Sequence, residues 1–276
     1  MRHPPVVLGI VGNPVAERRA LAAGISRLLG GAQHVSRLSM DDYRKQSRED
    51  GLKQALTAAH PAGVRLDMVA QHLSLLKRGE AVLRPTYNRA NDAFDAAVYI
   101  EPQTFVVIDG ELAFFTQGVR NSLDLRVFYS SDDAVDEWPG GLAEDALAYV
   151  ASQRKWADMV VEHLPSADVS EGTALTLTLR PTLPHLALQT LLQSAGEQHG
   201  MRLELARDMG LPVDRVVIDS TIGRQAAGYF KKRLLAEMQG ELRLAPEAES
   251  ETQDCAESLA LAQMLIALHL LKVARG

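Results

Sequence analysis

The chain has 276 residues, with 46% hydrophobic residues and 29 Lys and Arg against 35 Asp and Glu, which gives a formal net charge of −6. This composition is typical of a soluble globular protein and excludes a disordered or fibrous chain. The negative balance argues against a nucleic-acid partner bound through bulk basicity. The single cysteine, Cys255, excludes an internal disulfide and a multi-thiolate metal site.

The histidines and two apolar segments indicate whether the protein binds metal, is secreted or contacts a membrane. No metal is expected, because ligand spacing with acidic or cysteine partners is lacking at His163, His185, His199 and His269. The apolar run 6–12 is too short for a signal sequence with a cleavage site, so a cytoplasmic location is expected. The uncharged stretch 258–271 falls short of the roughly 20 apolar residues that span a bilayer. It predicts no membrane contact but a buried helix, in the core or at a subunit interface.

Alternating strand and helix patterns predict an α/β protein with a mostly parallel central sheet flanked by helices. In chain order, residues 6–11 predict a strand, 16–29 a helix, and 35–38 a strand that ends at the acidic turn 40–43. A helix at 66–77 and strands at 105–108, 125–129 and 159–164 follow. Beyond residue 173 the pattern predicts strands at 173–180, 202–206 and 213–219 and helices at 184–196, 222–239 and 258–271. We expect one domain over 1–276, with a core at 1–165 and a C-terminal α+β extension at 173–276.

The turn after the first strand is a candidate phosphate site, because nucleotide-binding folds hold phosphate between a strand, a glycine turn and a helix. Aligned with G-x-x-x-x-G-K-[ST] from Gly12, the chain has Glu17, Arg18 and Arg19 at the last three fixed positions. The Glu17 carboxylate would face a polyphosphate, and Arg19 offers no hydroxyl to magnesium. The turn is therefore predicted to have lost its triphosphate. The alternative is an anion loop that uses Arg18 and Arg19.

Further segments, in order along the chain, resemble the phosphoribulokinase family, which is related to the uridine kinases. Residues 41–44 are similar to its acidic turn D-D-Y-H, and 105–112 resemble its acidic strand V-I-E-G-L. Residues 149–161 resemble Y-I-x-P-Q-R-x-x-A-D-V-V, and 84–88 resemble its P-x-Y-N turn. Other similar segments are 60–61 with 66–68, 72–80, 100–102 and 258–267. The resemblance covers nearly the whole chain and implies a P-loop kinase-like fold.

The resemblance also implies roles for single residues. Asp41 stands where the family keeps the carboxylate that accepts the proton of the sugar hydroxyl, and Asp109 replaces a glutamate near magnesium. Arg48 matches an arginine that binds the sugar phosphate. The substrate-binding candidates are Tyr43, Arg44, Arg48, Tyr87 and Arg89, of which Arg44 and Arg89 replace histidines, and Arg84 could join the arginines in an anion pocket. The nucleotide-binding candidates are Gly12, Arg18 and Arg19. The structural alternatives are turn capping by Asp41 and Asp42, a polar strand end at Asp109, and solvated arginines.

The family's basic lid helix is missing: Pro139, Gly140 and Gly141 follow Trp138, and the chain resumes at residue 142. Lids of this kind supply positive charge and exclude water. The truncation near 138–142 therefore favours a pseudokinase without a cofactor, which binds a sugar phosphate or an active phosphoribulokinase paralogue. The alternatives are a divergent active kinase that uses Mg-ATP and a sensor of a phosphorylated metabolite. The resemblance further implies a homo-oligomer, a dimer or larger.

Overall fold

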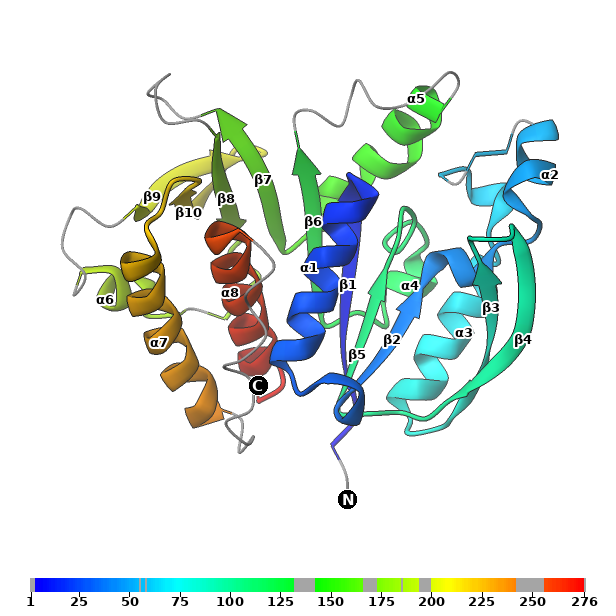
Figure 1. Cartoon of the computed structure of the whole chain (residues 1–276), viewed down its shortest axis with the longest axis horizontal. Coiled ribbons are helices and arrows are strands. Elements are labelled where there is room, and N and C mark those ends of the chain that lie inside the picture. The colour runs from blue at the N-terminus through cyan, green and yellow to red at the C-terminus, as the bar shows by residue number, and fades with distance from the viewer. Residues whose placement is uncertain are drawn as a thin grey trace.

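The centre of the computed structural model is an eight-stranded sheet in the order β2-β5-β1-β6-β7-β8-β10-β9 (Figure 1). The structure describes residues 3–54, 56–57, 59–131, 142–165, 173–184, 186–193, 200–241 and 256–275. The parallel strands are β1 Val6–Asn13, β2 Val35–Ser39, β5 Phe105–Asp109, β6 Leu125–Ser131 and β7 Met159–Pro165. Strands β8 Thr173–Leu179, β10 Leu211–Asp219 and β9 Met201–Asp208 continue the sheet antiparallel. The predicted fold class, including the added C-terminal strands, is confirmed.

Helices cover both faces of this sheet. One face carries α1 Val15–Leu28, α7 Arg224–Glu241 and α8 Glu257–Val273, and the other carries α3 Leu66–Lys77 (Figure 1). The shorter helices are α2 Arg48–Lys53, α4 Gln117–Arg120, α5 Leu142–Asp145 and α6 Leu188–Gln193. Short 3-10 or π-helical segments are η1 Gly31–Gln33, η2 Met40–Tyr43, η3 Pro61–Gly63, η5 Ala146–Val150 and η6 Ala151–Trp156. Within the described ranges, no helix is long and apolar enough to cross a membrane.

Strand β1 separates two hydrophobic cores. Because successive side chains of a strand point to opposite faces, Leu8 and Ile10 join the core under α1 and α8. Val7 and Val11 join the core under α3. All four side chains have no exposed surface, so β1 is buried on both faces, as parallel sheets require. The chemistry of this strand is therefore confined to its carboxyl end.

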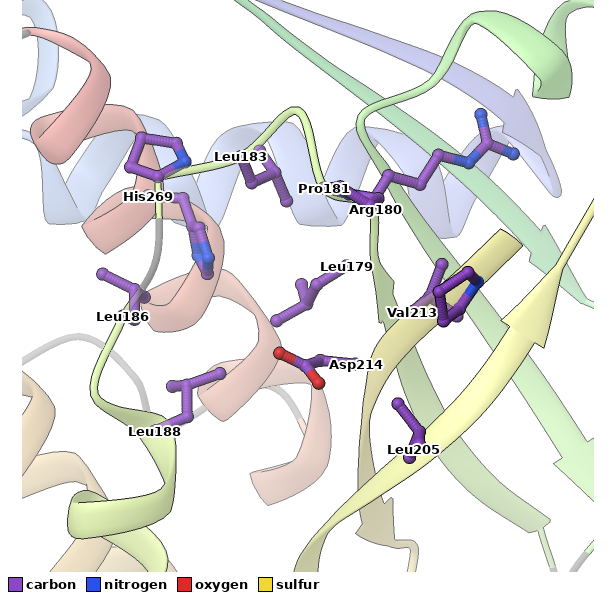
Figure 2. A pocket seen from close by; sticks show the side chains of 12 residues that line it. Leu179, Arg180, Pro181, Leu183, Leu186, Leu188, Leu205, Val213, Asp214 and His269 are labelled. Carbon is purple, nitrogen blue, oxygen red and sulfur yellow. The ribbon is translucent and has the colours of Figure 1, made fainter.

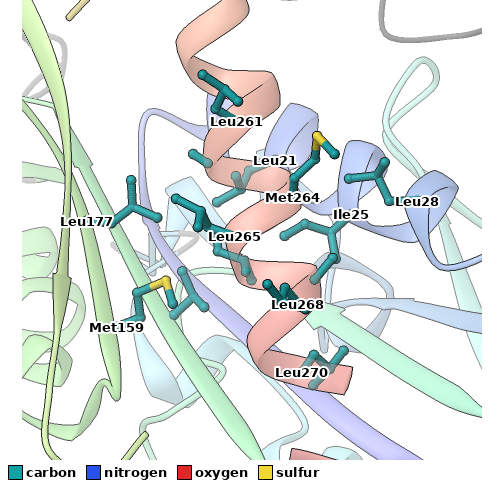
Figure 3. Close-up of a cluster of buried hydrophobic side chains, with 14 of the residues drawn as sticks. Leu21, Ile25, Leu28, Met159, Leu177, Leu261, Met264, Leu265, Leu268 and Leu270 are labelled. Atoms are coloured by element: carbon teal, nitrogen blue, oxygen red, sulfur yellow. The ribbon is translucent and has the colours of Figure 1, made fainter. Parts of the chain in front are cut away.

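Helix α8 is a core element. Its Leu261, Met264 and Leu265 lie between α1 and the sheet, where Leu21 and Ile25 face them from α1 (Figure 3). Residues 260–271 of α8 are buried within the chain, which explains why the helix is apolar on all sides. Of the two predicted places for this helix, the core and a subunit interface, the structure shows the core, because α1, α7 and β8 cover it.

The structure departs from the predicted elements in two places. Residues 84–88, predicted as a turn, belong to β3 Val82–Asn88, which forms an antiparallel hairpin with β4 Ala93–Ile100. The turn was expected from the family resemblance. Pro85 lies where the pairing register shifts between Arg84 and Thr86, and such a shift accommodates a residue without an N–H donor in a strand. Helix α6 begins at Leu188 rather than 184, and residues 194–196 of its predicted end lie outside the described ranges.

Candidate functional site

The candidate site lies at the carboxyl ends of the parallel strands. Strand β1 is the switch point of the sheet, because β5 and β2 lie on one side of it and β6 and β7 on the other. Open α/β sheets bind ligands at such points. The register pairs Asp109 of β5 with Ile10 of β1 and with Ser39 of β2. Asp109 and the η2 turn that carries Asp41 therefore reach the same edge.

The turn after β1 is short and needs glycine. Gly12 has φ +135°, and a Cβ there would lie 1.7 Å from the carbonyl oxygen of Tyr129. Helix α1 begins at Val15, so Pro14 alone separates the strand from the helix, and the Asn13–Pro14 peptide bond is cis. Of residues 12–17, which would form an open phosphate loop, 12–13 end β1 and 15–17 begin α1.

Arg18 fills the space behind this turn. Its guanidinium donates a hydrogen bond to the Gly12 carbonyl oxygen at 2.7 Å and has no exposed surface. Glu111 lies 3.4 Å and Asp109 3.6 Å from guanidinium nitrogens of Arg18. Burial alone would lower the pKa of Arg18, but the neighbouring Glu111, Asp109 and Asp41 carboxylates raise it above its usual value. Arg18 is therefore a charged group held by protein partners.

The Asp109 carboxylate has fewer hydrogen-bond partners than the Arg18 guanidinium. Burial raises its pKa, against the opposing charges of Arg18 and Arg37, whose Nη2 lies 3.5 Å from the carboxylate. The Oδ2 atom of Asp109 and the Nε atom of Arg18 are both buried without a hydrogen-bond partner. The pair is held by charge rather than by a directed hydrogen bond.

Three arginines surround Asp41. Arg19 donates to Oδ2 at 2.6 Å, Arg89 donates to the same oxygen, and Arg44 donates to Oδ1 at 3.2 Å. The carboxylate is only 6% exposed. Burial favours its neutral form, but the charges of Arg89, Arg44 and Arg19 outweigh burial and hold the pKa of Asp41 below its usual value. Both oxygens of this carboxylate are thus engaged.

The β3–β4 hairpin forms a wall beside this arginine cluster, by which we mean Arg19, Arg44 and Arg89. The Asp42 carboxylate accepts a hydrogen bond from the backbone N–H of Tyr87 at 3.0 Å and lies 3.2 Å from Arg84. The guanidinium of Arg44 lies over the Tyr87 ring, 5.4 Å from its centre. Tyr87 thereby lines the cluster, whereas Arg84 is held at its neighbour Asp42.

Two predicted site residues lie apart from the cluster. Tyr43 is fully buried, and its hydroxyl bonds to His72 Nδ1 at 3.1 Å in the α3 core. The Arg48 side chain is exposed, and its backbone N–H donates to Asp92 at 2.7 Å. Asp92 also accepts from the Tyr87 hydroxyl. The structure thus brings Asp41, Arg44, Tyr87 and Arg89 together, and it places Tyr43 and Arg48 outside their cluster.

Glu17 does not face the turn as expected. Its carboxylate accepts a hydrogen bond from the Tyr129 hydroxyl of β6, and His163 Nε2 of β7 lies 2.8 Å from the same hydroxyl. Burial and the Glu17 charge raise the pKa of Tyr129. The helix thus turns the Glu17 side chain toward β6 and β7, and its repulsion of a polyphosphate stays a prediction.

Sequence reasoning missed Glu111 and Arg37. The signal was available for Glu111, because a buried arginine in the first helical turn requires a nearby carboxylate. Some sequence predictions concern residues outside the described ranges: the lid truncation at 139–141, His185, His199 and Cys255. Over the described part of the chain, no group of three or more His, Cys, Asp or Glu side chains is arranged to hold a metal ion.

Comparisons with known proteins agree with this architecture. The model of the phosphoribulokinase / uridine kinase family matches residues 19–138. A phosphoribulokinase from Synechocystis sp. is 24% identical over 195 residues, which cover 63% of this chain and 58% of that protein. A uridine kinase from Bacillus pumilus is 25% identical over 135 residues, which cover 48% of this chain and 64% of that protein.

A solved phosphoribulokinase structure from Rhodobacter spheroides aligns with a TM-score of 0.60 at 12% identity, over 88% of this chain and 100% of that chain. The resemblance to the phosphoribulokinase / uridine kinase family and the P-loop kinase-like fold are confirmed. The chain spans between 42% and 58% of the length of the first five phosphoribulokinases it matches.

Proposed function

We propose that this chain, whose resemblance to the phosphoribulokinase / uridine kinase family those matches establish, binds a phosphorylated sugar and does not transfer phosphate from ATP. The observation that carries the proposal is the arginine cluster around Asp41. This aspartate stands where the family resemblance expects the group that accepts the substrate's proton. Here it is an ion-pair partner.

The electrostatics of Asp41 do not suit proton transfer. A general base works best when its pKa lies near the working pH. Arg89, Arg44 and Arg19 hold the pKa of Asp41 below its usual value, which weakens it as a base. Both of its oxygens also accept hydrogen bonds from guanidinium groups, so a substrate hydroxyl would have to displace an arginine.

The turn after β1 does not fit Mg-ATP. A phosphate loop presents successive backbone N–H groups and a lysine to the phosphates, and a Ser or Thr hydroxyl to magnesium. Here helix α1 starts at Val15, the Arg18 guanidinium is bound to the Gly12 carbonyl, and Arg19 is paired with Asp41. These residues do not fit a nucleotide, and we propose that nucleotide binding has been lost.

The arginine cluster suits an anionic ligand. Three guanidinium groups face one carboxylate, and the Arg19 and Arg89 side chains are 34% and 40% exposed. Guanidinium groups bind phosphate through paired hydrogen bonds, so an incoming phosphate can share the donors that Asp41 leaves unused. A sugar phosphate is a ligand class that carries this anion.

A divergent active kinase is the second candidate. The observation in its favour is that Asp41 and Asp109 still lie at one sheet edge, at the switch point of the fold. A sensor of a phosphorylated metabolite uses the same cluster as the proposed function and differs only in its downstream partner.

Calorimetry tests the proposal with ribulose 5-phosphate, ribulose 1,5-bisphosphate, inorganic phosphate and Mg-ATP as separate titrants. We expect a sugar phosphate to bind, and Arg89→Gln to weaken it about tenfold, the cost of one charge-assisted hydrogen bond. Arg202→Gln is the matched control, because Arg202 is half-exposed on β9 and pairs with Glu204. Micromolar binding of Mg-ATP together with ADP release in the presence of a sugar phosphate would establish the kinase instead.

A further inference from the structure

A cavity lies in the C-terminal extension, away from the arginine cluster. It has a volume of about 340 Å³ and lies between the end of β8, the segment that leads to α6, the β9–β10 hairpin and α8 (Figure 2). In the sheet, β6 and β7 separate β8 from β1. Pockets for small molecules start at about 300 Å³, so the cavity has room for a compact ligand.

The walls of this cavity are largely apolar. Leu179, Leu186, Leu188 and Val213 are buried, and Leu183 packs against the same core. Figure 2 shows leucine side chains surrounding the space on several sides. Apolar walls of this kind favour an apolar group that removes them from water.

Two of the polar residues at the cavity are already engaged. Arg180 donates to Asp208 at 2.8 Å and to the Ala157 carbonyl at 2.7 Å, and Figure 2 shows its guanidinium directed away from the space. His269 is 1% exposed, and its Nδ1 lies 2.8 Å from the Leu265 carbonyl oxygen. Burial lowers the pKa of His269 to about 4, so it is neutral at neutral pH.

Asp214 differs from both. It lies directly opposite Leu179 in the β8–β10 pairing, and directly opposite residues of antiparallel strands project to the same face. Figure 2 shows its carboxylate extending into the space among Leu179 and Leu188. Among the described residues, no ion pair or hydrogen bond engages this carboxylate. Asp214 itself is exposed, so water reaches its carboxylate. The cavity therefore combines apolar walls with one solvent-accessible negative charge that no described residue pairs.

We propose that this cavity binds a small molecule that has an apolar body and one cationic nitrogen, an ammonium or an amidinium. The apolar body lies against Leu179, Leu186 and Leu188, and the cationic nitrogen donates hydrogen bonds to the Asp214 carboxylate. A neutral ligand of the same shape gains no charge interaction with Asp214, and an anionic one is repelled by it. The inference is independent of the arginine cluster and of the function proposed for it.

Titrations of the full chain, followed by NMR or calorimetry, test this inference with three probes of similar size: phenethylammonium, 2-phenylethanol and phenylacetate. We expect the ammonium probe to bind about fivefold more tightly than the alcohol, which is the range of a solvent-exposed ion pair. Phenylacetate should bind most weakly. Equal dissociation constants for the three probes, or no binding of the ammonium probe, would overturn the inference.

Variants locate the effect. Asp214→Asn keeps the side-chain shape and should remove the preference for the ammonium probe over the alcohol. Asp50→Asn removes the same charge from exposed α2 and should leave the preference unchanged. If Asp50→Asn reduces the preference as much as Asp214→Asn, the preference comes from long-range charge and the proposed site is wrong.

Leu183→Trp, which fills the cavity, should weaken the binding of all three probes. If that variant does not fold, the comparison of the two asparagine variants still decides the outcome.

Discussion

The guanidinium of Arg18 donates a hydrogen bond to the carbonyl oxygen of Gly12, 2.7 Å away, where strand β1 passes into helix α1. The protein's own side chain thus occupies the space behind the turn, and the contact is supported by Glu111 and Asp109. An arginine at this position closes the turn because its planar group reaches a carbonyl and two carboxylates at once.

Removing Arg18 should destabilise the fold strongly. Arg18→Ala leaves the buried Glu111 and Asp109 without their shared cation, and breaking a buried pair in this way costs about 3–5 kcal/mol. Urea unfolding at pH 7 measures the change. Arg19→Ala is the control, because Arg19 is partly exposed and Asp41 keeps two other arginines. A loss for Arg18→Ala no larger than that of the control would contradict the interpretation of Arg18 as a buried structural cation.

Mg-ATP should bind with a dissociation constant above 1 mM in calorimetry, because the turn after β1 has no open loop of N–H donors.

Restoring three loop residues with Glu17→Gly, Arg18→Lys and Arg19→Ser should not create phosphoribulokinase turnover, since Arg44 and Arg89 still engage Asp41. A coupled assay for ADP release measures turnover by the native chain and by the triple variant. Turnover near 1 s⁻¹, at the low end of the usual ~1–1000 s⁻¹ for enzymes, would show that the rest of the site remains competent.

His269 should make stability depend on pH. Burial lowers its pKa from 6.5 to about 4, so above pH 6.5 it is neutral in both the folded and the unfolded chain. Between pH 6.5 and 4 the unfolded chain takes up a proton that the folded chain excludes, and the free energy of unfolding falls by about 3 kcal/mol. Urea titrations across this range compare the native chain with His269→Leu. The variant should lose that much less stability on acidification, and parallel pH curves would refute the assignment.

Gly24 should be intolerant of larger side chains. A Cβ at this position would lie 2.2 Å from the Gln263 side chain, where α1 crosses α8, and Gln263 donates to the Ala20 carbonyl. Gly24→Val should therefore lower the free energy of unfolding by about 1–3 kcal/mol through overpacking. Gly228→Ala is the control: it lies in α7 with open space around it and should stabilise the helix by about 0.5–1 kcal/mol. Similar losses at both sites would mean that the α1–α8 crossing is not tightly packed.

The family resemblance predicts an oligomer, and the structure restricts which surface can form it. Because residues 260–271 of α8 are buried within the chain, we expect a free edge of the main sheet, β2 or β9, at the interface. Light scattering at tens of micromolar should give a dimer or larger, and co-purification tests an active phosphoribulokinase as a mixed partner. A strict monomer that ignores such a kinase would leave only the small-ligand role.

Much of the scaffold could be predicted from periodicity. The helix predicted at 66–77 coincides with α3, and the buried runs at 105–108 and 125–129 lie within β5 and β6. These segments are determined locally, because a spacing of 3.6 or an unbroken apolar run reports which faces are buried. The β3–β4 hairpin was not predicted: residues 84–88 were expected as a turn from the family resemblance, and only pairing with β4 shows that they form a strand.

The sequence by itself determined that Glu17, Arg18 and Arg19 replace the glycine, lysine and hydroxyl residue of a phosphate loop, since those identities need no coordinates. Only the tertiary structure decided where the side chains go. Arg18 meets Glu111 across 93 residues, because the register of the parallel strands brings the ends of β1 and β5 to one edge. Asp41 meets Arg89 across 48 residues, because the β3–β4 hairpin packs against the η2 turn. Ion pairs depend on distance through space, and separation along the chain does not reveal that distance.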